Sequence, residues 1–204
     1  GQSTPWPVAL ADQSANPALD EALHTHAAAA QALLYPVSAE LLATTGRPVD
    51  LFGFEPNPAR LGAAAAASAS VPGIALTQLG ALLDAAALGY NPAQAKPVVV
   101  LGHSQGVLAV HMVQAICEAG SIDAAAAKID EILAIATLIG VAGTRQARQL
   151  GLAARHGEAT PMLSVKDITR AQVDALIERV DGARGPIAVA VTNSATHYVL
   201  SGYP

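Results

Sequence analysis

The chain has 204 residues, of which 52% are hydrophobic and 13% charged, and it carries a formal net charge of −5 at pH 7. That length allows one domain with a sizeable core, or a core with a small additional lobe. The acidic balance and the lack of a basic stripe argue against nucleic acid as a partner.

Cysteine content and hydrophobic run length bear on the compartment. A single cysteine, Cys117, excludes an intrachain disulfide framework and is typical of a reducing compartment. The longest apolar run, residues 132–143, is interrupted only by Thr137 and is about 12 residues long, whereas a membrane span needs roughly 20. No signal-peptide pattern opens the chain. We therefore expect a cytoplasmic protein that does not enter a membrane.

The first part of the chain predicts helices joined by loops. Residues 1–6 have a turn-like composition, and helical patterning covers about residues 17–44. A loop rich in proline and glycine follows over residues 46–58. Residues 70–88 predict another helix, and Gly89 is its expected end.

The middle of the chain predicts a strand, a turn and two helices. Residues 97–101 are Pro-Val-Val-Val-Leu, a β-branched run that favours a strand buried on both faces, as in a parallel sheet. Helices are predicted over residues 106–118 and about 124–150. This strand–turn–helix order places a glycine-rich turn between two regular elements.

The last part of the chain has a different pattern. Strands are predicted at residues 162–165, 187–192 and 198–201, with an amphipathic helix at 169–180 between the first two. The β-α-β-β order indicates a small α+β lobe.

The turn after residue 101 is a G-x-S-x-G elbow, Gly102-His103-Ser104-Gln105-Gly106. A serine hydroxyl is a poor nucleophile unless the fold exposes it and a base takes its proton. We expect the two glycines to be required because a Cβ would crowd the turn. The elbow would present Ser104 at the N-terminus of a helix, where the N–H of Gln105 is the expected first oxyanion donor. The alternatives are a plain glycine-rich turn or an elbow that has lost its catalytic partners.

The elbow with its strand and helix resembles the acyltransferase fold of malonyl/acyl-CoA:ACP transacylases. Within that family the chain is most similar to the acetyltransferase domain of actinobacterial type I fatty acid synthase. The other segments that carry the resemblance are residues 1–6, which resemble the family's Gly-Gln-Gly turn, and residues 53–56, 70–78, 138–144, 193–194 and 199–202. The resemblance implies an α/β-hydrolase-like acyltransferase core over residues 1–158. It also implies an inserted ferredoxin-like lobe over residues 159–204 that is truncated at its C-terminus.

The resemblance also implies roles for individual residues. The N–H groups of Gln2 and Gln105 would form the oxyanion hole, with Ser3 where the family has glycine. Malonyl-specific members hold the substrate carboxylate with an arginine, and the matching position here is Ile139. Isoleucine cannot pair with a carboxylate, so we expect an uncharged acyl group, most simply acetyl. Asn193 is expected near the active-site cleft; the alternative is a residue of a strand-end turn.

The family's general base is a histidine after the ferredoxin-like lobe, so the resemblance places it beyond Pro204, and the strand before Gly1 would also be missing. We therefore expect the isolated segment to be nearly inactive. Of the six histidines, His24 and His26 are predicted on the surface, His103 beside the pocket, His111 in packing or on the surface, and His156 in a loop; His197 is the alternative base. Arg145 and Arg148 are predicted to be solvated, and Trp6 and Cys117 to lie in the core.

These observations predict ping-pong acyl transfer. Acetyl-CoA would acylate Ser104, and the phosphopantetheine thiol of an acyl carrier protein would take the acetyl group, which primes fatty acid synthesis. No bound cofactor or metal is expected. The partners would be the carrier protein and other domains of a homo-oligomeric synthase. The alternatives are a malonyl or palmitoyl transferase of the same family, a serine thioesterase or esterase, and a catalytically silent scaffold segment.

Overall fold

The structure, a computed structural model, describes residues 5–34, 50–53, 56, 67–97, 99–149, 162–184 and 187–202. The chain divides into two compact units, Gly1–Gln146 and Ala147–Pro204. The expected domain boundary between residues 158 and 159 lies outside the described residues, so it stays a prediction. Each unit is treated by itself below.

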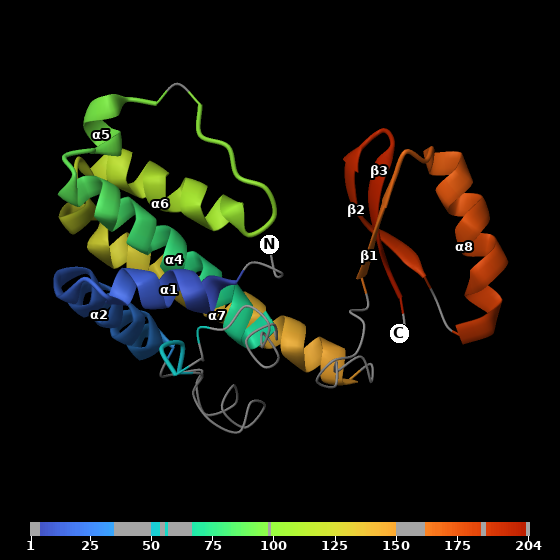
Figure 1. Cartoon of the computed structure of the whole chain (residues 1–204), viewed down its shortest axis with the longest axis horizontal. Helices are drawn as coiled ribbons and strands as arrows, with labels where there is room; N and C mark the ends of the chain where they lie inside the picture. The colour runs from blue at the N-terminus through green and yellow to red at the C-terminus, as the bar shows by residue number, and fades with distance from the viewer. Residues whose placement is uncertain are drawn as a thin grey trace. The chain divides into compact units, whose positions relative to one another are not determined.

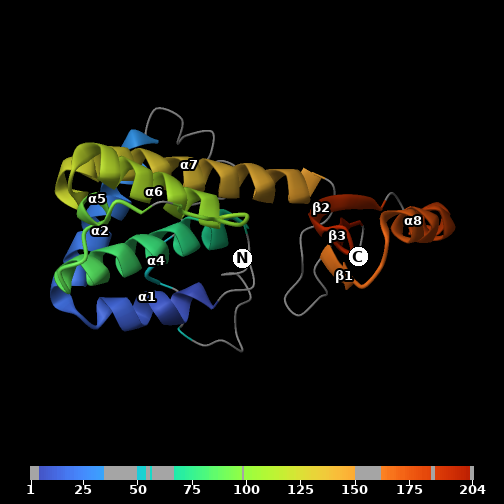
Figure 2. The ribbon, with the colours of Figure 1, turned by 90° about the horizontal axis from the view of Figure 1, so that it is seen from above.

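The described part of the first unit is built from helices. They are α1 (Trp6–Ser14), α2 (Pro17–Leu33), α4 (Ala67–Ala87), α5 (Pro92–Ala95), α6 (Gly106–Ala119) and α7 (Ile122–Gln149). Helix α4 packs against α1, α2 and α6, and it lies between α1 and α6 in both views (Figure 1, Figure 2). The hydrophobic core of the unit therefore forms around α4.

Two glycines of α4 allow α1 to approach closely. A Cβ on Gly73 would lie 2.5 Å from ring carbons of Trp6, which is only 1% exposed. A Cβ on Gly80 would overlap the side-chain amide of Gln13, whose Nε2 donates to the Thr77 carbonyl over 2.9 Å. Residues seven apart in a helix lie on one face, so Gly73 and Gly80 form a shallow groove for α1. The prediction that Trp6 is a core residue is confirmed.

Helix α4 begins at Ala67, earlier than predicted, and contains Pro72. Pro72 lies inside the helix, where its missing N–H removes one backbone hydrogen bond, and the helix continues through it. The first turn is held to α7, because the Ser68 N–H donates to Thr144 Oγ1 over 2.9 Å. Gly89 follows the helix with φ +90, as expected of a glycine stop.

Among the described residues, α4 is long and apolar enough to cross a membrane. Of that apolar stretch, 56% is buried inside the protein, which is the pattern of a core helix. Its apolar character is therefore explained by its central position in the first unit.

Helix α1 was not predicted from the sequence. Residues 1–6 were predicted as a turn, but Pro5 and Pro7 lie at the start of the helix, and proline is favoured in the first helical turn, where its missing N–H leaves no bond unmade. Helix α2 begins at Pro17 as predicted, with the Asn16 side chain accepting the Ala18 N–H over 3.2 Å. The helix ends at Leu33 with Leu34 as its C-cap, and residues 35–44 of the predicted helical stretch lie outside the described residues.

The strand predicted at residues 97–101 is wrong for the residues that the structure describes. Val99 is 66% exposed and Leu101 is 88% exposed, and neither belongs to a strand. All strands in the described part of the chain belong to the second unit. A β-branched run becomes a strand only when neighbouring backbone groups complete its hydrogen bonds, and the described part of this unit offers none.

The second unit has the predicted β-α-β-β order. Its elements are β1 (Met162–Lys166), α8 (Arg170–Arg184), β2 (Ala188–Ser194) and β3 (His197–Ser201). The strands form an antiparallel sheet in the order β1-β3-β2. Helix α8 covers one face of this sheet (Figure 1), and Val173 of the helix packs with Tyr198 and Leu200 of β3. Successive side chains of a strand point to opposite faces, so every second side chain lies on the face away from α8.

Candidate active site

Ser104 lies in the turn that precedes α6, in a backbone conformation that side chains rarely adopt. Its φ is +54, and the residue is exposed. A residue with a Cβ in this region is held there at a cost of order 1–3 kcal/mol, and such residues cluster at functional sites. The elbow therefore exposes Ser104 as the sequence predicted, at the N-terminus of a helix.

Close packing at Gly102, on the N-terminal side of Ser104, leaves no room for a side chain. A Cβ on Gly102 would overlap the Gly106 carbonyl and lie 2.7 Å from Val110 Cγ2. A Cβ on Gly106, in contrast, would meet no atom of the described residues within 4 Å. The expectation that both glycines are needed for space is therefore wrong for Gly106. The backbone carbonyl of Gly106 lies against Gly102, so a side chain is excluded at Gly102 but not at Gly106.

The N-terminus of α6 leaves one hydrogen-bond donor open beside Ser104. The N–H of Gly106 donates to the His103 carbonyl over 2.9 Å, and the N–H of Val107 donates to the Ser104 carbonyl over 3.1 Å. In the part of the chain that the structure describes, the N–H of Gln105 has no protein acceptor. It lies at the positive end of the α6 dipole, where an anion is stabilised. Gln2, the second expected donor, lies outside the described residues.

The side chain of Gln105 is a second feature of this turn. Its Oε1 is buried and has no hydrogen-bond partner among the described residues. The sequence placed only the backbone of Gln105 in the site. The buried amide oxygen in the residue after Ser104 could not be foreseen from the motif, because burial depends on how α6 packs.

None of the described histidines bonds to the Ser104 hydroxyl. His103 and His111 are exposed, and His156 lies outside the described residues. His24 is exposed as predicted, but His26 is half-buried and its Nδ1 lies 2.6 Å from Asp130 Oδ1. The surface prediction for His26 is therefore wrong, because its side of α2 faces α7. The general base expected beyond Pro204 stays a prediction.

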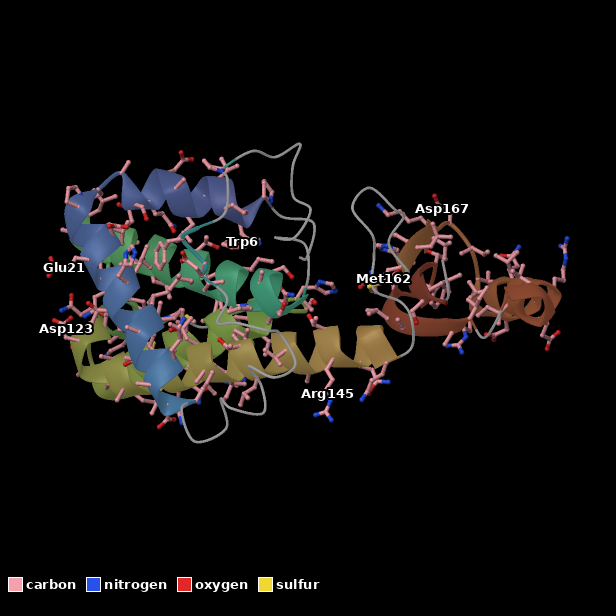
Figure 3. All side chains as sticks on the ribbon, turned by 90° about the horizontal axis from the view of Figure 1, so that it is seen from below. Trp6, Glu21, Asp123, Arg145, Met162 and Asp167 are labelled. Atoms are coloured by element: carbon pink, nitrogen blue, oxygen red, sulfur yellow. The ribbon has the colours of Figure 1, made fainter. Side chains whose placement is uncertain are left out.

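Ile139 lies on α7 and is 52% exposed. The next residue, Gly140, packs so closely that a Cβ there would overlap the Ala67 carbonyl of α4. In the described part of the chain, the apolar side chain of Ile139 is therefore only half covered by neighbouring residues. Its role in an acyl pocket stays a prediction. Arg145 is exposed and points away from the helices (Figure 3), so the prediction of a solvated charge is confirmed. The side chain of Arg148 lies outside the description.

Asn193 belongs to the second unit, in β2 rather than in a turn. Its Nδ2 lies 3.4 Å from Nε2 of His197, and the Ser164 hydroxyl lies 2.9 Å from the same nitrogen. These three side chains come from all three strands of the sheet. The sequence singled out Asn193 and His197 but missed Ser164, because only the strand register brings it to them.

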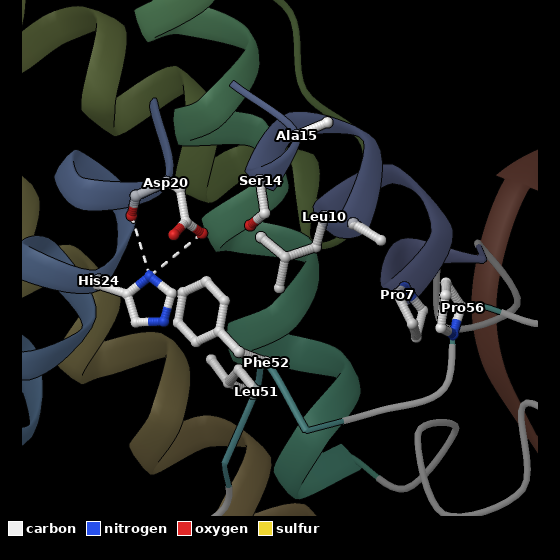
Figure 4. Close-up of a pocket in the computed structure, with 10 residues that line it drawn as sticks. Pro7, Leu10, Ser14, Ala15, Asp20, His24, Leu51, Phe52 and Pro56 are labelled. Carbon is white, nitrogen blue, oxygen red and sulfur yellow. Dashed lines mark hydrogen bonds and ion pairs between the residues drawn. The ribbon is translucent and has the colours of Figure 1, made fainter. Parts of the chain in front are cut away.

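The described residues also form a cavity of about 400 Å³ between α1, α2 and the turn at residues 50–53 (Figure 4). His24 stacks on Phe52 with ring centroids 3.6 Å apart, and its Nδ1 bonds to the Asp20 carbonyl oxygen over 2.9 Å. No residue of the elbow lines this cavity. The cavity is therefore separate from the Ser104 site in the described part of the chain. The stacking of His24 on Phe52 attaches the turn at residues 50–53 to α2.

Two further sequence predictions concern metal ligands and Cys117. Within the described ranges, no cluster of three or more histidine, cysteine, aspartate or glutamate side chains is placed to hold a metal ion. The predicted core position of Cys117 is wrong, since this cysteine is exposed on α6 and is not in a disulfide. An amphipathic helix end leaves such a residue on the solvent side.

A family model described as "Starter unit:ACP transacylase in aflatoxin biosynthesis" matches residues 57–204. The match includes the Ser104 elbow, α6, α7 and the whole second unit. Among curated proteins, none matches the chain significantly.

Proposed function

The chain belongs to the starter unit:ACP transacylase family, and on this premise we propose that Ser104 is the residue that carries the acyl group. Membership makes the protein an acyltransferase of the kind that delivers a starter unit to an acyl carrier protein. The observation that carries the proposal is the exposed Ser104 at φ +54, next to the open N–H of Gln105.

The proposed reaction has two halves that use the same site. The Ser104 Oγ attacks the thioester carbonyl, a base takes the hydroxyl proton, and the oxygen that becomes negative accepts the N–H of Gln105. The carbon–sulfur bond then breaks, and the leaving thiolate takes the proton. In the second half the phosphopantetheine thiol of the carrier gives its proton to the base and attacks the acyl-serine, and Ser104 is regenerated.

For the identity of the acyl group we propose acetyl, delivered by acetyl-CoA. The support is Ile139, an apolar and half-exposed side chain at the position where malonyl-specific relatives have an arginine. A carboxylate held against isoleucine would lose hydration without gaining a partner. No residue of this chain would need to hold a cofactor, since the substrate thioester supplies the activated acyl group.

We further propose that the chain works within a fatty acid synthase, as a homo-oligomer in the cytoplasm, alongside an acyl carrier protein. The exposed Cys117, which is not in a disulfide, fits a reducing compartment. The fold proposed for the complete domain is an α/β-hydrolase-like core with a ferredoxin-like lobe. Its support is the elbow in the first unit and the β1-β3-β2 order in the second.

The test is transfer of a labelled acetyl group from acetyl-CoA to a phosphopantetheine thiol by the full-length protein. We expect Ser104→Ala to abolish transfer. Ser121→Ala is the matched control, because Ser121 also sits at a helix N-terminus, where it accepts the Ala124 N–H over 3.1 Å. That control should lose about 1 kcal/mol of stability and no transfer activity. Undiminished transfer by Ser104→Ala would overturn the proposal.

A further inference from the structure

The C-terminal half of α7 packs tightly against the first turn of α4. A Cβ on Gly140 would overlap the Ala67 carbonyl oxygen and lie 3.2 Å from Ser68 Cα, so only glycine allows this approach. One turn later on α7, Thr144 Oγ1 accepts the Ser68 N–H over 2.9 Å. Residues four apart lie on one face of a helix, so Gly140 and Thr144 form one contact surface toward α4.

The hydrogen bond to Ser68 gives this contact a defined geometry. The first four N–H groups of a helix have no acceptor within the helix, and Ser68 is the second residue of α4. The acceptor comes here from another helix, through the hydroxyl of Thr144. Ser68 is only 8% exposed, so loss of that acceptor would leave a buried donor unsatisfied. The contact therefore holds α7 at a fixed distance from α4 and in a fixed rotation.

Ile139 lies directly beside this contact. Successive residues of a helix are rotated by about 100°, so Ile139 points away from the surface that Gly140 presents to α4. Its exposure of 52%, with 49% at Ile135 one turn earlier, agrees with that placement. Helix α4 also packs against α6, which begins directly after the Ser104 turn. The position of Ile139 relative to Ser104 therefore depends on the contact between α4 and α7.

We propose that Gly140 and Thr144 are positioning residues that set the place of Ile139 and thereby the choice of acyl group. The inference rests on the proposed function, in which Ile139 contacts the acyl group carried by Ser104. Gly140 and Thr144 face α4 and act only through Ile139. One methylene more or less in a hydrophobic pocket changes discrimination by about tenfold or more, so a comparable displacement of α7 has a measurable effect on selectivity.

The experiment compares two alanine substitutions on α7 in the full-length protein. Gly140→Ala places a methyl group against the Ala67 carbonyl, whereas the new Cβ of Gly143→Ala lies 3.4 Å from Ala67 Cβ, close to an ordinary van der Waals contact. Both changes favour the helix equally, so they differ in the contact with α4. We expect the acetyl-CoA over malonyl-CoA preference in kcat/KM to fall by about five- to tenfold in Gly140→Ala. It should change by less than about twofold in Gly143→Ala.

A second pair of variants tests the hydrogen bond without adding bulk. Thr144→Val keeps the β-branched shape and removes the acceptor for the Ser68 N–H, while Thr144→Ser keeps that acceptor. The acetyl preference should fall in Thr144→Val and be retained in Thr144→Ser. This pair decides the matter if Gly140→Ala does not fold. A preference that is unchanged in Thr144→Val and in any folded Gly140→Ala protein, or that falls equally in Gly143→Ala, would overturn the inference.

A reporter that does not depend on acyl transfer separates this inference from the proposed function. Ile139→Cys is alkylated with iodoacetamide, and peptide mass spectrometry follows the rate at that position. We expect the rate to shift when Gly140→Ala is added and to stay the same when Gly143→Ala is added. Absence of acetyl transfer by the wild type would count against the proposed function. An alkylation rate that does not shift would overturn the positioning role of Gly140, whatever the result for transfer.

Discussion

The two glycines of the elbow give a matched pair of substitutions with opposite expected results. In Gly102→Ala the new methyl group would overlap the Gly106 carbonyl and lie 2.7 Å from Val110 Cγ2. Because the carbonyl oxygen and carbon of Gly106 are both backbone atoms, the backbone of the turn or of the first turn of α6 must move. In Gly106→Ala the methyl group meets no atom within 4 Å in the part of the chain that the structure describes, and the position is the first residue of a helix.

The magnitudes follow from the packing. Overpacking typically costs 1–3 kcal/mol, so Gly102→Ala should lower the free energy of unfolding by about 2 kcal/mol. A shift of the turn by about 1 Å would displace Ser104 from the Gln105 N–H and reduce acylation by about a hundredfold. Gly106→Ala should be neutral or stabilising by up to about 1 kcal/mol, because alanine favours the helix.

Two measurements compare the variants in the full-length protein. Chemical denaturation gives the free energy of unfolding, and labelled acetyl-CoA gives the rate of acylation of Ser104. The free energy of unfolding separates a folding defect from a displaced nucleophile. Equal losses in the two variants would refute the reasoning, because the motif alone treats the glycines alike and only the structure distinguishes them.

Three further predictions concern helix packing, the contact between His26 and Asp130, and the acyl group. Gly73→Ala should cost about 1–3 kcal/mol of unfolding free energy in urea titration, since its methyl group would lie 2.5 Å from Trp6 ring carbons; no change would contradict the α1–α4 contact. A double-mutant cycle on His26 and Asp130, whose side chains are 12% and 16% exposed, should give a coupling of about 1 kcal/mol, and additive effects would refute the pairing. The wild type should prefer acetyl-CoA over malonyl-CoA by about tenfold or more in kcat/KM, and Ile139→Arg should erode that preference by pairing with the carboxylate. Ile135→Arg, at an equally exposed site one turn earlier on α7, should leave it unchanged, and equal use of both thioesters by the wild type would remove the acetyl assignment.

Elements whose signal is local were predictable from the sequence. The helices at Gly106–Ala119 and Ile122–Gln149 and the β-α-β-β order of the second unit all follow from short-range periodicity. The run at residues 97–101 misled because strand formation depends on a neighbouring strand, which local composition does not report. Helix α1 was missed because proline at a helix start reads like proline in a turn.

The candidate site was predictable in part. The motif identified Ser104 and its helix, but not that the steric demand falls on Gly102 alone. The exposure of Cys117 and the pairing of His26 depend on which face of a helix meets a neighbour, and so does the burial of the Gln105 amide oxygen. Ser164 joins His197 only through the register of β1 and β3. Such contacts arise from tertiary packing, and a single sequence carries no direct signal for them.

The most direct test of the central claim is the identity of the residue that holds the acyl group. The full-length protein is mixed with acetyl-CoA, quenched in acid and analysed by tandem mass spectrometry of its peptides. We predict one acetyl ester, on Ser104, that disappears when a phosphopantetheine thiol is added before the quench. An acetyl group on a different residue, or transfer to the thiol with Ser104 never acylated, would contradict it.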